Sequence, residues 1–133
     1  MAWSAVAAGV KGLLVYSYDA GHSGVRHEPA VWRVCQQFAQ EFKPLQSVAT
    51  THRPTPLPTG DREVVAVRWT TAKSIDFLII NTSTNNKKTV SLQLQAGTKG
   101  KLESLLGGMR RTEHTLTGEV PPAEVAHLRI VTS

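Results

Sequence analysis

Apolar side chains recur with a period of two along the second half of this chain, from residue 63 to residue 133. Val65, Val67 and Trp69 share one face of the first segment, and Val90, Leu92 and Leu94 alternate with Ser91, Gln93 and Gln95 in the third. This period is typical of β-strands. Strands are predicted at residues 63–70, 75–81, 89–95, 101–106, 112–116 and 125–131. Six short strands with turns between them predict an antiparallel β-sandwich.

The second of these strands is apolar on both faces. Ile75, Phe77 and Ile79 point to one side, and Leu78 and Ile80 to the other. Asn81–Asn86 then has turn chemistry. Asn81-Thr82-Ser83 also matches the N-glycosylation sequon. Because no secretion signal accompanies it, we interpret it as a turn.

Residues 1–43 have a different pattern. Small, helix-favouring residues from Ala2 to Val10 precede a continuous apolar run, Gly12–Tyr18. Such a run is typical of a strand buried on both faces, as in a parallel sheet. Pro29 suits the first turn of a following helix, which ends near Pro44. One stripe of that helix carries Val31, Cys35, Phe38 and Phe42.

Residues 44–62 contain four prolines, at positions 44, 54, 56 and 58, with Thr and Gly between them. This composition predicts an extended, partly stiff linker on the surface, without regular hydrogen-bonded structure over residues 50–60. The expected organisation is a terminal α/β unit (1–43), a linker (44–62) and a β-sandwich domain (63–133). The α/β unit has a strand but no parallel partner for it, so we expect self-association through residues 13–18.

Composition narrows the class of protein. The chain has 133 residues, 41% of them hydrophobic, and a single cysteine. Disorder and a disulfide scaffold are therefore excluded, and a complete (β/α)₈ barrel needs about 200 residues or more.

The formal charge of +5 is spread along the chain, so no nucleic-acid surface is predicted. The apolar stretch 2–18 lacks preceding basic residues and is interrupted, so neither a signal peptide nor a membrane anchor is expected.

The order of these parts resembles the C-terminal end of glycoside hydrolases built from a (β/α)₈ barrel and a following all-β domain, of the beta-galactosidase-like kind. The resemblance rests on Ala8-Gly9-Val10-Lys11-Gly12-Leu13-Leu14-Val15-Tyr16-Ser17-Tyr18, on Trp32 and Glu41–Leu45 in the next helix, and on the strand Ile75–Ser83 with its partner Lys88–Leu92. It implies an α+β chain: a helix–strand–helix remnant of the barrel followed by the antiparallel β-sandwich.

The resemblance also implies which active-site residues of a glycoside hydrolase this chain lacks and which it could contain. Retaining hydrolases use two carboxylates about 5–5.5 Å apart, which in such barrels follow the fourth and seventh strands. No residue here matches either, so no catalytic residue is assigned. Tyr16, Tyr18, Asp19 and His22 would lie at the carboxyl end of the last barrel strand, where substrate binds. They are candidate carbohydrate-binding residues of an intact parent. The alternatives are packing for the tyrosines and a turn for Asp19.

Other residues that could form a catalytic or metal site do not match the motif that their chemistry requires. Ser23 lies between a strand and a helix, but Val25 occupies the last glycine position of a nucleophile elbow. His22, His27 and Glu28 match no zinc spacing, so no metal and no cofactor are expected. Cys35 is predicted to be a buried, inert thiol, and Trp69 to be a core residue.

The sequence therefore predicts a C-terminal glycoside hydrolase fragment with an accessory β-sandwich and no complete catalytic site. Two alternatives stay open. One is a free-standing carbohydrate-binding sandwich, which an exposed aromatic platform would favour. The other is a small enzyme that uses the His22/Ser23 loop.

Overall fold

A computed structural model describes residues 2–13 and 27–132. Three helices come first: α1 (Ala2–Ala7), α2 (Pro29–Phe42) and α3 (Gln46–Thr51). The strands follow as β1 (Thr55–Leu57), β2 (Val64–Thr70), β3 (Ser74–Asn81), β4 (Lys88–Gln93), β5 (Lys101–Leu106), β6 (Arg110–Arg111), β7 (Thr115–Val120) and β8 (Val125–Val131). The described part of the chain is therefore α+β, as predicted.

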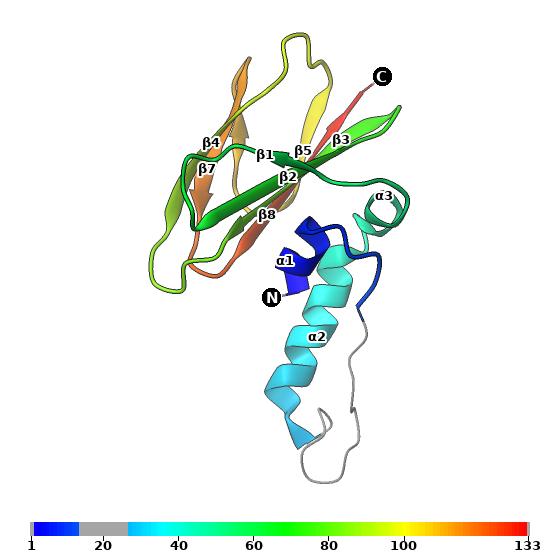
Figure 1. Cartoon of the computed structure of the whole chain (residues 1–133), viewed down its shortest axis with the longest axis vertical. Coiled ribbons are helices and arrows are strands. Elements are labelled where there is room, and N and C mark those ends of the chain that lie inside the picture. The colour runs from blue at the N-terminus through cyan, green and yellow to red at the C-terminus, as the bar shows by residue number, and fades with distance from the viewer. Residues whose placement is uncertain (1, 14–26, 133) are drawn as a thin grey trace.

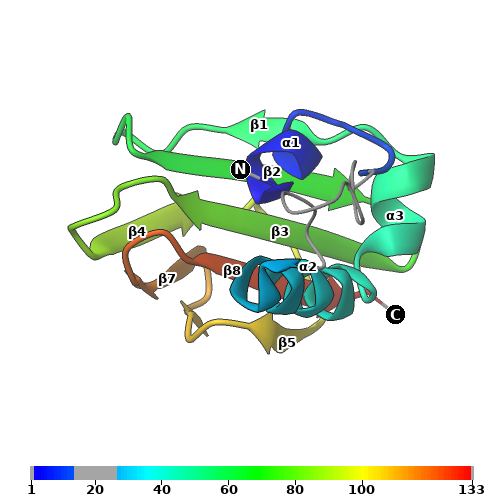
Figure 2. The same cartoon turned by 90° about the horizontal axis from the view of Figure 1, so that it is seen from below.

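The strands form two sheets, and every pairing among the described residues is antiparallel. The larger sheet has the order β1-β2-β3-β8-β5, and the smaller sheet has the order β4-β7-β6. Figure 1 shows the two sheets facing each other, with the helices on the outer side of the larger sheet. Figure 2 shows α1 over β2. The architecture is a β-sandwich with a third, helical layer.

The space between the two sheets holds the larger core. The larger sheet contributes Val64, Ala66, Phe77, Ile79, Ala126, Leu128 and Ile130, and the smaller sheet and its loops contribute Val90, Leu92, Leu94, Met109, Leu116 and Val120. These positions alternate along their strands, as the period-two pattern predicted. Each is at most 9% exposed, so the sandwich is closed without any help from the helices.

A second core lies between the larger sheet and the helices. Val6 and Ala7 of α1, Leu45, and Val48 and Ala49 of α3 pack on Val67, Trp69, Leu78 and Ile80. This layer explains why β3 is apolar on both faces: one face meets the small sheet and the other meets the helices. Trp69 is fully buried, which confirms its predicted core role.

Most predicted strands occur within one or two residues of their expected bounds. The exception is residues 112–116, where the prediction of one strand is wrong. Thr112 donates its N–H to the carbonyl of Thr115 at 2.8 Å, so the chain turns there, between β6 and β7. The residue pattern of 112–116 resembles that of a strand. In the structure Arg111 pairs with Leu116, so the residues between them form the turn of a hairpin.

The prediction of a linker without regular structure is also wrong for part of residues 44–62. Residues 46–51 form α3, and β1 pairs with β2 in the register Pro56↔Val67. Leu45 is fully buried. A proline is tolerated in β1 because this strand lies at the edge of the sheet, where one side needs no N–H donor. Tertiary contacts on both sides of the segment outweigh its local composition.

The predicted strand 12–18 falls almost entirely outside the described residues; Gly12 and Leu13, which are described, belong to no strand. None of the helices in the described ranges has both the length and the apolar character needed to cross a membrane.

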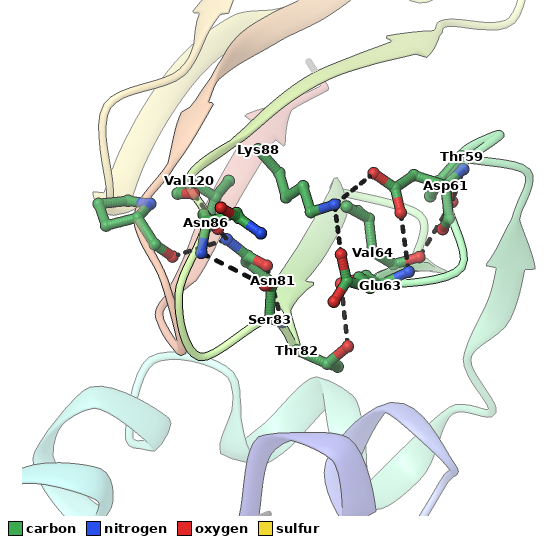
Figure 3. Close-up of polar contacts among 11 residues, drawn as sticks. Thr59, Asp61, Glu63, Val64, Asn81, Thr82, Ser83, Asn86, Lys88 and Val120 are labelled. Atoms are coloured by element: carbon green, nitrogen blue, oxygen red, sulfur yellow. Dashed lines mark hydrogen bonds and ion pairs between the residues drawn. The ribbon is translucent and has the colours of Figure 1, made fainter.

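Asn81 shows how the turn after β3 is held (Figure 3). Its side-chain nitrogen donates to the carbonyls of Asn86, Val120 and Pro121 at 2.7–3.0 Å, and its oxygen accepts the N–H of Ser83 at 3.0 Å. Asn81 is 1% exposed. An amide engaged in this way joins the β3–β4 turn to the end of β7 and presents no acceptor nitrogen for a glycan. The turn interpretation of the sequon is confirmed.

A second polar network lies beside it on the surface (Figure 3). The Lys88 ammonium lies between the carboxylates of Asp61, at 3.0 Å, and Glu63. The hydrogen bond from the backbone N–H of Glu63, together with Lys88, holds the pKa of Asp61 below its ordinary value, 3.8. Glu63 and Asp61 in turn raise the pKa of Lys88 above 10.5. The network connects the turn before β2 to the first residue of β4.

Candidate functional site

The residues predicted to bind carbohydrate, Tyr16, Tyr18, Asp19 and His22, lie outside the described residues, as does Ser23. His27 and Glu28 are described and exposed immediately before α2. Within residues 2–13 and 27–132, no three His, Cys, Asp or Glu side chains come together as metal ligands would.

The apolar stripe of α2 is poorly covered by the described residues. Pro29 at the first position and the four-three-four spacing of apolar residues form a regular amphipathic helix, as predicted. No residue of α2 is fully buried, and Val31 and Val34 are 47% and 65% exposed. Cys35 is only partly buried, so the prediction of a buried thiol is wrong. Figure 1 shows the reason: α2 projects away from the sandwich, and only its carboxyl end meets the sheet layer.

The stripe forms one wall of an apolar groove of about 570 Å³. We call this the α1–α2 groove; its apolar walls are Val6, Val10, Leu13, Val34, Cys35 and Phe38. Val10 and Leu13 are themselves 39% and 48% exposed. Exposed apolar residues that lie together, here on α2 and on the segment that follows α1, are a feature of surfaces that contact another part of a protein or another molecule.

Aromatic contacts and hydrogen bonds hold together the residues beneath the groove. Trp3 of α1 meets Phe38 edge-to-face with ring centroids 4.9 Å apart, and Phe38 stacks on Phe42 at 5.7 Å. Lys11 donates to the carbonyls of Ala49 and His52 at 2.9 and 2.8 Å. These carbonyls belong to the carboxyl end of α3, where unpaired acceptors and the helix dipole favour a cation. The segment that follows α1 is thereby attached to α3.

A buried polar cluster attaches the helices to the sheet. The Asp76 carboxylate, fully buried on β3, is 2.9 Å from Nε2 of His127 and 2.9 Å from Nε of Arg129. Arg129 also donates to the carbonyl of Pro44 at 2.8 Å, at the junction of α2 and α3. Nδ1 of His127 is buried without a hydrogen-bond partner among the described residues. Because Arg129 joins β8 to the α2–α3 junction, we interpret the cluster as a connection between layers.

This cluster was missed by the sequence reasoning. A signal for it existed: Asp76 interrupts an otherwise apolar strand, and His127 and Arg129 occur two residues apart in β8. A charge in such a position is almost always paired. The partner could not be identified from the sequence, because Asp76 and His127 are 51 residues apart.

The sandwich offers no aromatic platform among its described residues. Trp69 and Phe77 are the only Trp, Tyr or Phe residues after position 62, and both are at most 2% exposed. The observation that would have favoured a free-standing carbohydrate-binding sandwich is therefore missing.

Comparison with known proteins returned no matching family model, no matching curated protein and no matching solved structure.

Proposed function

We propose that this chain is the C-terminal part of a glycoside hydrolase, in which the β-sandwich is an accessory domain and the α1–α2 groove packs on the body of the (β/α)₈ barrel. Under this proposal α1 and α2 are the last helices of the barrel, and its last strand would lie between them, after Leu13. Tyr16, Tyr18, Asp19 and His22 would then face carbohydrate at the carboxyl end of that strand.

The observation that carries the proposal is the contrast between the two parts of the chain. The sandwich closes its own core, whereas the described residues bury no residue of α2 fully and leave Val31 and Val34 exposed. In a barrel, each helix buries such a stripe against parallel strands. The aromatic contacts join α1 to α2, and the Asp76 cluster connects β3 and β8 to the junction of α2 and α3. The β-domain would thereby fix the end of the barrel in place, which is a structural and not a catalytic role.

Two consequences follow for the isolated chain. It lacks the carboxylate pair of a glycosidase, so it should not hydrolyse aryl glycosides above the buffer rate. Its groove lacks the barrel body, so the chain should self-associate through the groove and residues 13–18.

The decisive experiment begins with the reading frame upstream of the Met1 codon. The proposal requires it to encode the remaining strands and helices of a barrel, with glutamates at two strand ends. The upstream polypeptide is then expressed with and without this chain, and hydrolysis of a panel of aryl glycosides is measured. We expect activity only when both parts are present.

A pair of variants tests the groove. Val34→Glu places a charge on the exposed apolar wall and should abolish complementation, because Val34 is 65% exposed and its change should not unfold the chain. Gln36→Glu places the same charge on an exposed position of the same helix, outside the groove lining, and should leave complementation intact. An upstream frame without a barrel, or equal complementation by both variants, would refute the proposal.

A further inference from the structure

One side of β4 is a strand edge that carries unpaired backbone groups. β4 is the first strand of the smaller sheet, and among the described residues it pairs with β7 alone. Leu94 continues this ladder, because its N–H donates to the carbonyl of His114 at 2.8 Å. In an antiparallel ladder, alternate residues direct both N–H and C=O to the same neighbour. The even-numbered residues of β4 therefore bond to β7. The odd-numbered residues direct their backbone groups to the other side: Thr89, Ser91 and Gln93.

We call this other side the β4 edge. Within the described ranges, no hydrogen bond joins its outward N–H and C=O groups to another residue. The side chains at its three outward positions are exposed and uncharged, and β4 contains no proline or glycine. Its six residues pair with β7 in one unbroken register. A regular edge of this kind is a template for another strand.

The other edge strands of the described sheets are short or irregular. β1 has three residues and includes Pro56, which has no N–H to donate. β6 has two residues. β5 begins with the charged Lys101, and its register with β8 shifts between Ser104 and Leu106. Charges, prolines and bulges are the usual means by which proteins prevent strand addition at an edge. The outward positions of β4 have none of these features.

The β4 edge is complementary to a second copy of itself. Residues that face each other in an antiparallel pair lie on the same face of the sheet. When Ser91 lies opposite the same residue of a second copy, Thr89 lies opposite Gln93, and all three outward positions meet outward positions. On the core face, Val90 then lies opposite Leu92, which are both buried in the single copy. Polar side chains thus meet polar ones, and apolar side chains meet apolar ones.

The one charge of β4 does not oppose this pairing. The Lys88 ammonium lies between the carboxylates of Asp61, at 3.0 Å, and Glu63 (Figure 3). In the register centred on Ser91, Lys88 lies opposite Leu94 of the second copy, outside the three hydrogen-bonded pairs. Its charge is therefore compensated within its own chain and faces no second lysine.

The unequal width of the two sheets leaves a place for an added strand. The larger sheet has five strands and the smaller sheet three. The contacts of Lys88 with the turn before β2 place β4 at the side of the sandwich where β1 and β2 lie. Leu57 of β1 packs on the core between the sheets but is only partly buried by the described residues. A strand beside β4 would extend the smaller sheet over β1.

We propose that two copies of this chain pair through their β4 edges, antiparallel and about a two-fold axis at Ser91. The two smaller sheets then form one continuous sheet, and the outward backbone groups of both copies are paired. A two-fold interface uses the same patch on both copies, which this register provides. The inference rests on β4 and not on the proposed function. The α1–α2 groove belongs to the helical layer, on the other side of the larger sheet, so the two modes of association can be separated.

Disulfide trapping tests the register in the full chain. The background carries Cys35→Ser, which removes the single thiol, and Val34→Glu, which blocks association through the groove. Ser91→Cys places two thiols at facing positions whose Cα atoms would be about 5.5 Å apart, within disulfide range. We expect a disulfide-linked dimer under mild oxidation. Thr117→Cys, on the same face but one strand further from the edge, should stay monomeric.

Backbone and charge variants at the axis test the hydrogen bonds, with the dimer dissociation constant measured by sedimentation equilibrium in the Val34→Glu background. Ser91→Pro removes an outward N–H that the ladder with β7 does not use, so the fold should be retained, as circular dichroism would show. It should weaken the dimer about 10-fold or more. Ser91→Ala keeps the N–H and should leave the constant unchanged. Ser91→Lys keeps the backbone intact, places two like charges opposite each other and should also weaken the dimer.

Several results would overturn the proposal. One is a chain that stays monomeric at millimolar concentration while Ser91→Cys forms no more disulfide dimer than Thr117→Cys. Another is unchanged association of Ser91→Pro and Ser91→Lys. Slow exchange of the Ser91 amide in a monomer would mean that another part of the same chain covers the edge. Protection of that amide in a monomer only when the peptide Lys-Thr-Val-Ser-Leu-Gln is added would assign the edge to a separate strand. None of these results bears on complementation by the barrel, which is measured separately.

Discussion

Replacement of Asp76 by asparagine should destabilise the protein far more than any surface charge change. Asp76 is fully buried, and its Oδ1 accepts from Nε2 of His127 and from Nε of Arg129, each at 2.9 Å. Its Oδ2 accepts from the Ser74 hydroxyl at 3.1 Å. The asparagine oxygen would still face His127 and Arg129, and its N–H₂ would face the Ser74 hydroxyl, which can accept; the change removes the negative charge.

The magnitude follows from the loss of the carboxylate charge opposite Arg129. Removal of one partner of a buried ion pair costs about 3–5 kcal/mol. Arg129 is 23% exposed in its side chain and keeps its bond to the Pro44 carbonyl, so part of its charge stays solvated. The His127 side chain is 1% exposed, so water cannot solvate its ring in place of the carboxylate. We therefore expect a loss near the lower limit, about 3 kcal/mol, which corresponds to a fall of roughly 10 °C in Tm for a domain of this size.

The assay is urea unfolding followed by Trp fluorescence at neutral pH. Its matched control is Asp61→Asn, which removes the same charge from an exposed network and should shift the midpoint very little. A double-variant cycle with Arg129→Met tests the mechanism: the two losses should be strongly non-additive, because the second change removes a charge that the first left unpaired. Equal midpoints for Asp76→Asn and Asp61→Asn, or additive losses in the cycle, would refute the reasoning.

Three further predictions use other sites. Asn81→Ala should lower the free energy of unfolding, measured in urea, by about 3 kcal/mol, because it leaves buried carbonyls without a donor. A loss below about 1 kcal/mol would mean that the turn is held without this amide. Ala123→Gly should raise stability by about 0.5–1 kcal/mol, since Ala123 has φ +55° and glycine adopts a positive φ freely; a destabilised variant would contradict this argument. The lowered pKa of Asp61 means that its contribution to stability is complete above pH 3.8 and is lost as the pH falls through the folded value. Wild type and Asp61→Asn should therefore converge in Tm as the pH is lowered below about 4, and a difference that grew on acidification would contradict the assignment.

Local pattern identified β2, β3, β4, β5 and β8 of the sandwich. The alternation of Val90, Leu92 and Leu94 identified a strand with one buried face, and the turn that follows Asn81 was predicted correctly. The amphipathic period of α2 and its start at Pro29 were also predicted correctly from the sequence. These features depend on neighbours two to four residues away, which is the range over which backbone geometry repeats.

The same patterns could not say what covers each face. Val67 and Trp69 were predicted to share a buried face, yet their partners are helices and not the second sheet. Residues 46–51 and 55–57 became α3 and β1 despite a proline-rich context, since the exposed edge of β2 and the outer face of the sheet offered them partners. Likewise the exposure of Val34 and Cys35 follows from the direction in which α2 leaves the sheet.

The sequence by itself determined the alternation of strands, the turns between them and the amphipathic helix, because each is a local preference of the backbone and its adjacent side chains. Only the tertiary structure decided the helical layer, the Asp76 cluster and the α1–α2 groove. Asp76 meets His127 across 51 residues of sequence, and Arg129 reaches Pro44 across 85. Contacts at such separations arise from how the layers pack, and a one-dimensional pattern carries no information about which distant residue will complete them.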